Sequence, residues 1–231
     1  MKEVYMQVQS FTFNLFSENT YILYDETNEC IIIDPGCNDN YERQEISEFI
    51  RSNNLKPKHL INTHCHIDHI LGNKFIAETY NLPLTAHKKE KQVLDFGTQT
   101  AMMYQMPYEI SPDITKFLEE GDIITFGQTQ LDILFTPGHS PASISLYCKS
   151  ANILVAGDVL FQGSIGRTDL PGGNFETLTR NIKAKFFTLP DETVTGEMNA
   201  KVFTLPHKTI FLSKHINPTT IGIEKRTNPF F

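Results

Sequence analysis

THCHIDHILG, at residues 63–72, is the stretch from which the fold and the chemistry of this chain are best inferred. It holds three histidines and one aspartate within six residues, and all four side chains can ligate a metal ion through nitrogen or oxygen. Alternate residues of an extended segment point the same way, so we expect His64, His66 and Asp68 to converge. His69 follows where the chain turns into a helix. The stretch therefore predicts ligands for two ions that lie a few ångströms apart.

The residues around this stretch predict alternating strands and helices. HLIN, at 59–62, is a short apolar run typical of a buried strand, and a helix is expected at 72–80. Strand, polar loop and helix in this order form one α/β unit. Residues 41–52 also have helical spacing, with one apolar face. Short β-rich runs are expected to form strands at 4–16, 20–24, 30–33, 122–126, 131–135, 143–147 and 153–156.

This order of elements predicts an α+β fold in a single domain over residues 1–231. Strands followed by a helix in both halves indicate two sheets packed face to face, with helices outside. No linker divides the chain. Residues 88–105 could be helical, and 88–106 matches no motif, so this segment is the expected place for a substrate lid or a partner surface.

Three further candidates for metal ligands each follow an apolar strand. His139 comes after a strand and a tight turn, Asp158 follows the strand at 153–156, and His215 follows an apolar run at 209–212. Sheet-based sites collect functional residues in such loops, so these side chains are predicted to join the first cluster. The alternative for each one alone is a turn residue or a helix cap.

Composition narrows the partners and the compartment. The chain has 231 residues and a formal net charge of −7, without a concentrated basic patch, which argues against nucleic acid or an anionic membrane as the main partner. The N-terminus has no continuous apolar run, so neither a signal nor a transit peptide is expected, and the predicted location is the cytoplasm. The four cysteines form no CxxC pair, and Cys65 is expected to pack away from the histidines rather than act as a nucleophile.

Several motifs together resemble the metallo-β-lactamase superfamily. THCHIDHILG is similar to its THxHxDHxxG signature, and IIIDPG (31–36), FTPGHSPASISLY (135–147) and AGDVLFQGSIGRTDLPGG (156–173) resemble its other motifs in the same order. The match is nearest to the short glyoxalase II-like hydrolases, and TTIGIEKRTNPFF (219–231) resembles their tail. The resemblance implies a four-layer αββα sandwich with the site on one edge.

The resemblance also implies a role for each candidate residue. His64, His66 and His139 would hold one metal ion, Asp68, His69 and His215 would hold a second, and Asp158 would bridge the two. The expected cofactor is zinc, two ions per chain, with iron as the alternative. Asp68 and Asp158 would take part in catalysis, and Arg167, in GRTD, would contact the substrate; its alternative is a structural salt bridge.

The region before His215 departs from the family pattern. The family usually presents this histidine as PGHG, whereas this chain reads Ser213-Lys214-His215-Ile216. Just upstream, residues 176–194 and 192–210 match closely at an offset of 16, which indicates a local tandem duplication. A turn that needs a positive φ would be strained without the glycines. His207, in the second copy, is the reserve candidate for this ligand.

These residues predict hydrolysis of a small acyl thioester, as in glyoxalase II. Two divalent metals lower the pKa of a shared water and stabilise the oxyanion, and a thiolate leaves without a strong general acid. Full glyoxalase II enzymes carry an extra C-terminal region that grips glutathione, so we do not expect glutathione specificity. One alternative is a persulfide dioxygenase with iron held by His64, His139 and Asp158. The other is a metal-binding relative with an impaired second site.

Overall fold

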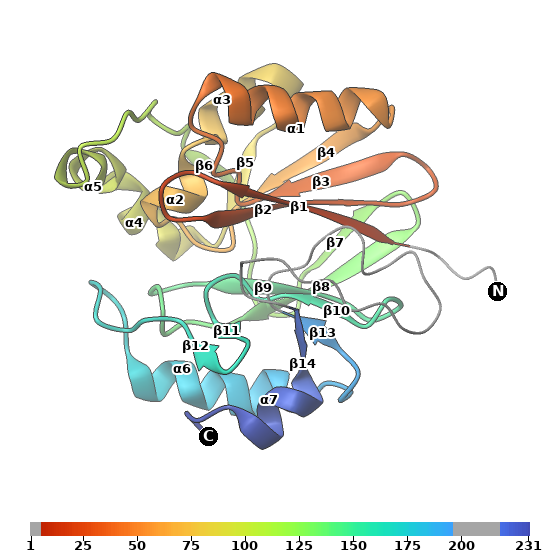
Figure 1. The fold of residues 1–231 in the computed structure, drawn as a ribbon, viewed down its shortest axis with the longest axis vertical. Coiled ribbons are helices and arrows are strands. Elements are labelled where there is room, and N and C mark those ends of the chain that lie inside the picture. The colour runs from red at the N-terminus through yellow and green to blue at the C-terminus, as the bar shows by residue number, and fades with distance from the viewer. Residues whose placement is uncertain (1–5, 196–217) are drawn as a thin grey trace.

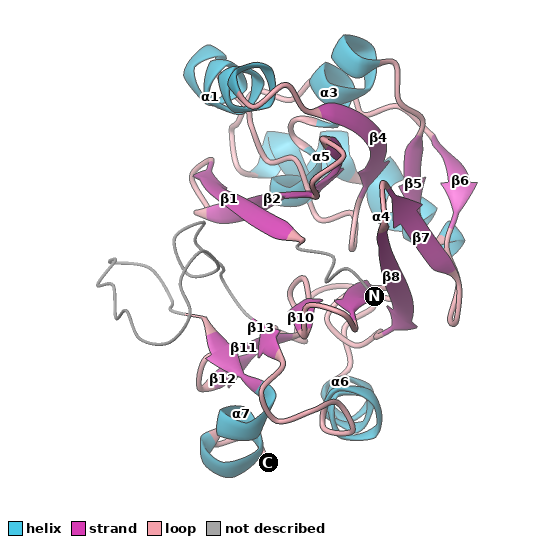
Figure 2. Cartoon of the chain, turned by 90° about the vertical axis from the view of Figure 1, so that its right-hand side faces the viewer, coloured by secondary structure: helices cyan, strands magenta, loops and turns pink. Residues whose placement is uncertain are grey.

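Two β-sheets lie face to face, with helices on their outer sides (Figure 1). The structure is a computed structural model, and it describes residues 6–195 and 218–231. The arrangement of helix layer, sheet, sheet and helix layer confirms the predicted α+β sandwich (Figures 1 and 2). None of the helices in the described ranges combines the length and the apolar character needed to cross a membrane.

The first sheet has six strands in chain order. Its first three strands run antiparallel, whereas the third to the sixth are parallel to one another. The strands are β1 (Gln7–Phe13), β2 (Glu18–Tyr24), β3 (Glu29–Ile33), β4 (Lys56–Ile61), β5 (Leu84–Ala86) and β6 (Ile114–Phe117).

The second sheet has the order β14-β13-β10-β9-β8-β7, and all of its pairs are antiparallel except β10 with β13. Its strands are β7 (Ile123–Phe126), β8 (Thr129–Phe135), β9 (Ile144–Cys148), β10 (Ile153–Val155), β13 (Val194–Thr195) and β14 (Thr219–Thr220). A small hairpin of β11 (Leu160–Phe161) and β12 (Ser164–Ile165) follows β10.

Helices of the first half cover the first sheet, and helices of the C-terminal part cover the second (Figure 1). On the first sheet lie α1 (Asn40–Ser52), α2 (Ile67–Ile70), α3 (Asn73–Tyr80), η1 (Lys88–Glu90), α4 (Lys91–Asp95) and α5 (Gly97–Met103). On the second lie α6 (Phe175–Asn181), the π-helical turn η2 (Ile182–Phe186) and α7 (Ile221–Thr227).

The alternating direction of side chains along single strands explains how the layers hold together. In β3, Cys30 and Ile32 pack in the cluster beneath the helices, while Ile31 and Ile33 pack in the cluster between the sheets. Successive side chains of a strand point to opposite faces, so a strand buried on both faces reads as a continuous apolar run. β3 therefore anchors both layers, and it ends directly before Asp34, on the edge where the candidate site lies.

The segment around the histidine cluster is less extended than expected. Helix α2 begins at Ile67, so Asp68 and His69 both lie on a helical turn and only His64 and His66 precede it. The prediction that Asp68 lies on one extended face with the two histidines is therefore wrong. A helical turn rotates neighbouring side chains by about 100° each, which spreads the ligating atoms over two positions instead of one.

The two copies of the duplicated sequence differ in structure where both are described. Leu178 and Thr179 of the first copy lie in α6, whereas the matching residues Val194 and Thr195 form strand β13. Leu178 is fully buried beneath the second sheet, while Val194 pairs with Ile153. The neighbouring elements, rather than the local sequence, thus decide between helix and strand here.

Candidate functional site

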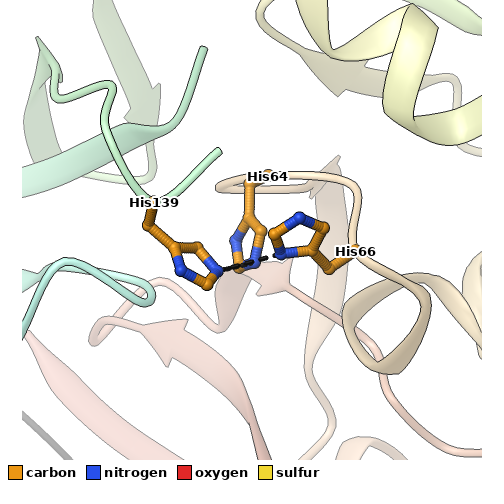
Figure 3. A group of neighbouring side chains, drawn as sticks. All are labelled: His64, His66 and His139. Carbon is orange, nitrogen blue, oxygen red and sulfur yellow. Dashed lines mark hydrogen bonds between the residues drawn. The ribbon is translucent and has the colours of Figure 1, made fainter. Parts of the chain in front are cut away.

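Three histidine rings meet at one edge of the sandwich (Figure 3). His64 and His66 come from the loop between β4 and α2, and His139 comes from the loop after β8. The Nε2 atom of His139 lies 3.2 Å from Nε2 of His64 and 2.9 Å from Nδ1 of His66. Two donors on a tetrahedral zinc ion lie roughly 3.3 Å apart, so these separations fit a single metal ion.

Hydrogen bonds on the far side of two rings fix which nitrogen faces the group. The Thr63 hydroxyl donates to Asp34 Oδ2 at 2.5 Å, so its oxygen is free to accept from His64 Nδ1 at 3.1 Å. His139 Nδ1 lies 2.8 Å from the backbone carbonyl oxygen of Arg167, which can only accept. Both Nδ1 atoms therefore carry the proton, and both Nε2 atoms present lone pairs to each other.

Facing lone pairs favour a bound cation over a proton. Burial lowers the pKa of His64 well below its ordinary value, and the nearby rings of His69, His66 and His139 lower it further. Burial likewise lowers the pKa of His66 to about 3, with help from His139. Neutral imidazoles are the form that binds metal, so the three-histidine group fits a resident metal ion.

A second group of ligating atoms lies beside the first. His69 Nε2 lies 3.6 Å from Asp68 Oδ2 and 3.5 Å from Asp158 Oδ1. The other oxygen of Asp158, Oδ2, lies 3.6 Å from His139 Nε2. One carboxylate thus turns an oxygen toward each group, which is the geometry that a bridging ligand requires.

Charge separates the two groups. Burial disfavours the His69 cation, but Asp68, Asp158 and Asp34 outweigh burial and raise the pKa of His69 well above its ordinary value. Burial would also raise the pKa of Asp158, yet the histidines, led by His69, hold it below its usual range. The carboxylates of the second group therefore stabilise positive charge at His69, which a bound divalent cation would supply in place of the proton.

Asp34 and Asn62 brace the loop that carries the first histidines. Asp34 Oδ1 accepts from the Thr63 backbone N–H at 2.7 Å, and its Oδ2 accepts from the Thr63 hydroxyl. The Asn62 amide donates to the His69 carbonyl at 2.9 Å. Although Asp34 lies near His64 and His69, both of its oxygens are already engaged. It acts as a support, like the outer partners that orient metal ligands.

Gly157 shapes the turn that presents Asp158. Its φ is +58°, and a Cβ atom there would lie 2.6 Å from the Thr63 hydroxyl oxygen. Only glycine meets both demands without strain. The turn after β10 thus packs directly on the loop after β4, which explains how ligands from two sheets come together.

A pocket opens beside the second group. Its lining includes Asp68, His69 and Asp158 of the second group and the aromatic side chains of Phe16 and Phe161. The Phe16 ring packs edge-on against Tyr104 of the loop after α5, with the ring centroids 5.0 Å apart. The pocket therefore combines polar atoms of the cluster with aromatic side chains.

The predicted residues fall into three classes in the structure. Six converge at the edge of the sandwich: His64, His66, Asp68, His69, His139 and Asp158. His215 and the reserve candidate His207 lie outside the described residues. Arg167 contributes its backbone to the site: its carbonyl orients His139, whereas its exposed side chain pairs with Asp169 at 2.7–2.8 Å. Cys65 is buried in the core beneath the helices, as expected.

Two supporting carboxylates were not predicted as site residues. Asp34 follows the apolar strand β3 just as Asp158 follows β10, so the same pattern could have revealed it. Glu90 lies in the charged run Lys88-Lys89-Glu90-Lys91, which is typical of a solvated surface, yet its side chain is fully buried. No sequence signal distinguishes it from its neighbours.

Comparison with known proteins settles the family. The model of the family described as "Metallo-beta-lactamase superfamily" matches residues 14–195. The chain belongs to the metallo-beta-lactamase superfamily. With its cluster of histidine and aspartate side chains, it is a metal-dependent hydrolase of that superfamily. The resemblance inferred from the motifs is confirmed.

Two relatives match over nearly the whole chain. "Probable metallo-hydrolase YqgX" of Bacillus subtilis is 37% identical over 213 residues, which are 92% of this chain and 91% of that protein. "Hydroxyacylglutathione hydrolase GloC" of Haemophilus influenzae is 30% identical and covers 97% of this chain and 98% of its own length.

Two solved structures share the fold of this superfamily member. BLEG-1 B3 metallo-beta-lactamase has a TM-score of 0.81 at 30% identity, and the match covers 96% of this chain and 98% of that one. TTHA1623 in a di-iron-bound form has a TM-score of 0.79 at 29% identity, with 96% and 99% covered.

Proposed function

We propose that this chain hydrolyses small acyl thioesters with two zinc ions held at the histidine–aspartate cluster. One observation carries the proposal: Asp158 turns one oxygen toward His69 and the other toward His139, so two groups of ligating atoms share one carboxylate. Shared carboxylates of this kind are typical of two-metal hydrolytic sites. His215, which lies outside the described residues, is proposed to complete the second group.

The residues of the chain divide the work of the reaction. His64, His66 and His139 would hold one ion, while Asp68 and His69 would hold the other. When bound, the two metals would lower the pKa of water and stabilise negative charge on the substrate oxygen. Thr63 and the Arg167 carbonyl keep the imidazoles in the tautomer that leaves Nε2 free.

The pocket and the relatives support a thioester as the substrate. A thiolate leaves without a strong general acid, and the pocket beside the cluster is lined in part by Phe16 and Phe161, against which a small acyl group would pack. GloC, a protein of matching length, is named as a hydroxyacylglutathione hydrolase. Chain length alone therefore does not argue against a glutathione thioester. A small-molecule substrate in the cytoplasm, without nucleic acid or membrane partners, is part of the proposal.

The test is thiol release from two thioesters by zinc-loaded protein. A hydroxyacyl thioester of glutathione and the same acyl group on a small thiol would show whether the thiol carrier matters. His66→Ala should lower kcat/KM by about a hundredfold or more, because it removes a proposed ligand. His59→Ala is the matched control, since that ring lies against the Thr125 carbonyl and away from the cluster. No turnover of either thioester, or full activity of His66→Ala, would contradict the proposal.

Iron chemistry is the second candidate because the same geometry contains a two-histidine, one-carboxylate group. His139 Nε2 lies 3.2 Å from His64 Nε2 and 3.6 Å from Asp158 Oδ2, and a trio of two histidines and one carboxylate is typical of non-haem iron oxygenases. A di-iron form is known for a structural neighbour. Two zinc ions in protein purified without added metal support the hydrolase, whereas one iron and oxygen consumption with a persulfide support the alternative.

A further inference from the structure

Glu90 is a buried carboxylate in an otherwise exposed run of charges. Lys88 reaches outward to Glu119 at 2.7 Å, and Lys91 pairs with Asp95 on the surface. Glu90 is 0% exposed and makes no ion pair among residues 6–195 and 218–231. A carboxylate without a counter-charge is costly to bury, so it needs several hydrogen bonds in compensation.

Three hydrogen bonds hold this carboxylate, and they come from two different loops. Its Oε2 accepts from the backbone N–H of Cys65 at 2.8 Å. Its Oε1 accepts from the Ser140 hydroxyl at 2.6 Å and from the Ala142 N–H at 2.8 Å. Cys65 follows strand β4 of the first sheet, while Ser140 and Ala142 follow β8 of the second. Glu90 therefore ties together loops that belong to opposite sheets.

These donors sit next to the three histidines in the chain. Cys65 lies between His64 and His66, and Ser140 follows His139 directly. The second group of ligating atoms depends on other contacts, including the bond from the Asn62 amide to the His69 carbonyl. The hydrogen bonds of Glu90 thus act on one group of ligands and leave the other to a separate support.

We propose that Glu90 is a positioning residue that sets the geometry of the three-histidine metal site. The inference rests on the proposed function only in taking this group as a metal site. A carboxylate is required because all three partners donate. Glutamine is nearly the same size but carries a single acceptor oxygen, so its NH2 group must face either the Cys65 N–H or the donors of the second loop. The donors of one loop then lose their hydrogen bonds to this side chain.

The experiment measures metal affinity rather than turnover. Metal-free protein is titrated with zinc against a chromophoric chelator, and the site that disappears in His66→Ala is taken as the three-histidine site. Glu90→Gln should weaken that site by about 10- to 100-fold, the range found for outer partners of metal ligands, and leave the second site unchanged. Ser140→Ala removes only one of the three donors and should weaken the same site by a smaller factor.

Glu224→Gln is the matched control. Glu224 is also fully buried and accepts from the Gly163 N–H, the Thr219 hydroxyl and the Asn228 amide, but it contacts none of the proposed ligands that the structure describes. Wild-type zinc affinity in Glu90→Gln would overturn the inference. So would an equal loss at both sites that Glu224→Gln reproduces, because that result indicates general destabilisation.

The remaining outcomes are also decisive. If Glu90→Gln does not fold, Ser140→Ala alone decides, and unchanged affinity in that variant overturns the inference. Wild-type protein that binds two zinc ions but hydrolyses no thioester would refute the proposed function and leave the role of Glu90 standing. Protein that binds no metal would refute both.

Discussion

The two ends of the first sheet are each joined to the second sheet by a buried carboxylate, but they carry different loops. At the site end, Glu90 links the loops that bear the histidines. At the other end, Asp25 accepts from its own turn at Thr27 and, across the sandwich, from Gln128 and Thr129 at 2.7 and 3.0 Å. Both carboxylates thus hold one sheet to the other through hydrogen bonds.

The surroundings of the two carboxylates shift their pKa values in opposite directions. Burial raises the pKa of Glu90 in spite of its three hydrogen bonds. Burial also acts on Asp25, but bonds led by that from Thr27 outweigh it, so the pKa of Asp25 lies below its ordinary value. The far end is thus arranged to stabilise the charged carboxylate itself. The site end instead places a costly charge where it can hold ligand-bearing loops, so stability and function are separable at the two ends of the first sheet.

A pair of glycine substitutions should distinguish the two ends of the sheet most strongly. Gly157 at the site and Gly127 at the far end both have positive φ, +58° and +53°, and a Cβ atom at Gly127 would collide with the Asp25 carboxylate. Alanine at either position should destabilise the fold by about 1–3 kcal/mol.

Only Gly157→Ala should also reduce thioester hydrolysis, by up to about a hundredfold, because it shifts Asp158. Denaturant unfolding and kcat/KM of both variants check this. Equal activity losses in Gly157→Ala and Gly127→Ala would contradict the separation of the two ends.

Asp25→Asn should lower the stability of the fold without changing hydrolysis. Asparagine has one acceptor oxygen where Asp25 uses two, so buried donors of the two turns lose a partner and the free energy of unfolding should fall by about 1–3 kcal/mol near neutral pH. Hydrolysis by the folded variant should be unchanged.

The pH dependence of that difference follows from the lowered pKa of Asp25. A carboxylate whose pKa is lower in the folded than in the unfolded chain stabilises the fold above its unfolded pKa of about 3.9. This contribution is lost as pH falls through the folded pKa. The gap in unfolding free energy between wild type and Asp25→Asn should therefore narrow below about pH 4. A gap that stays constant on acidification would count against this role.

The smallest expected effect concerns Arg167. Its exposed side chain pairs with Asp169, while its carbonyl orients His139. Arg167→Ala keeps the carbonyl and should leave the unfolding free energy unchanged, yet raise the KM for the thioester severalfold, because the family resemblance implies that this side chain contacts the substrate. Asp169→Asn removes the partner and keeps the arginine, so its KM should stay close to that of the wild type. An unchanged KM in Arg167→Ala would contradict substrate contact and leave the salt bridge with Asp169 as the role of this side chain.

The sequence pattern predicts the strands and the converging ligands for one physical reason. Apolar runs such as those of β3 and β10 identify buried strands, and polar residues directly after them must lie at a sheet edge. His139 and Asp158 are found in this way. Asp34 obeys the same rule, and its role becomes visible only through its contacts with Thr63.

Other features depend on tertiary contacts that no local pattern reveals. The charged run around Glu90 is typical of a solvated surface, and only the approach of Cys65 and Ser140 makes a buried carboxylate favourable there. The segment 88–106, expected as a lid or partner surface, thus contributes an internal support. The helical turn α2 likewise has a tertiary partner that the local sequence does not reveal, because the Asn62 amide donates to the His69 carbonyl within it.

We propose that Asp158 bridges two metal ions held by residues from both sheets. Anomalous diffraction from a crystal soaked in zinc tests it most directly. We predict two zinc peaks, one among His64, His66 and His139 and the other beside Asp68 and His69, with one Asp158 oxygen on each. A single peak, or an Asp158 side chain turned away from the histidines, would contradict this bridging role.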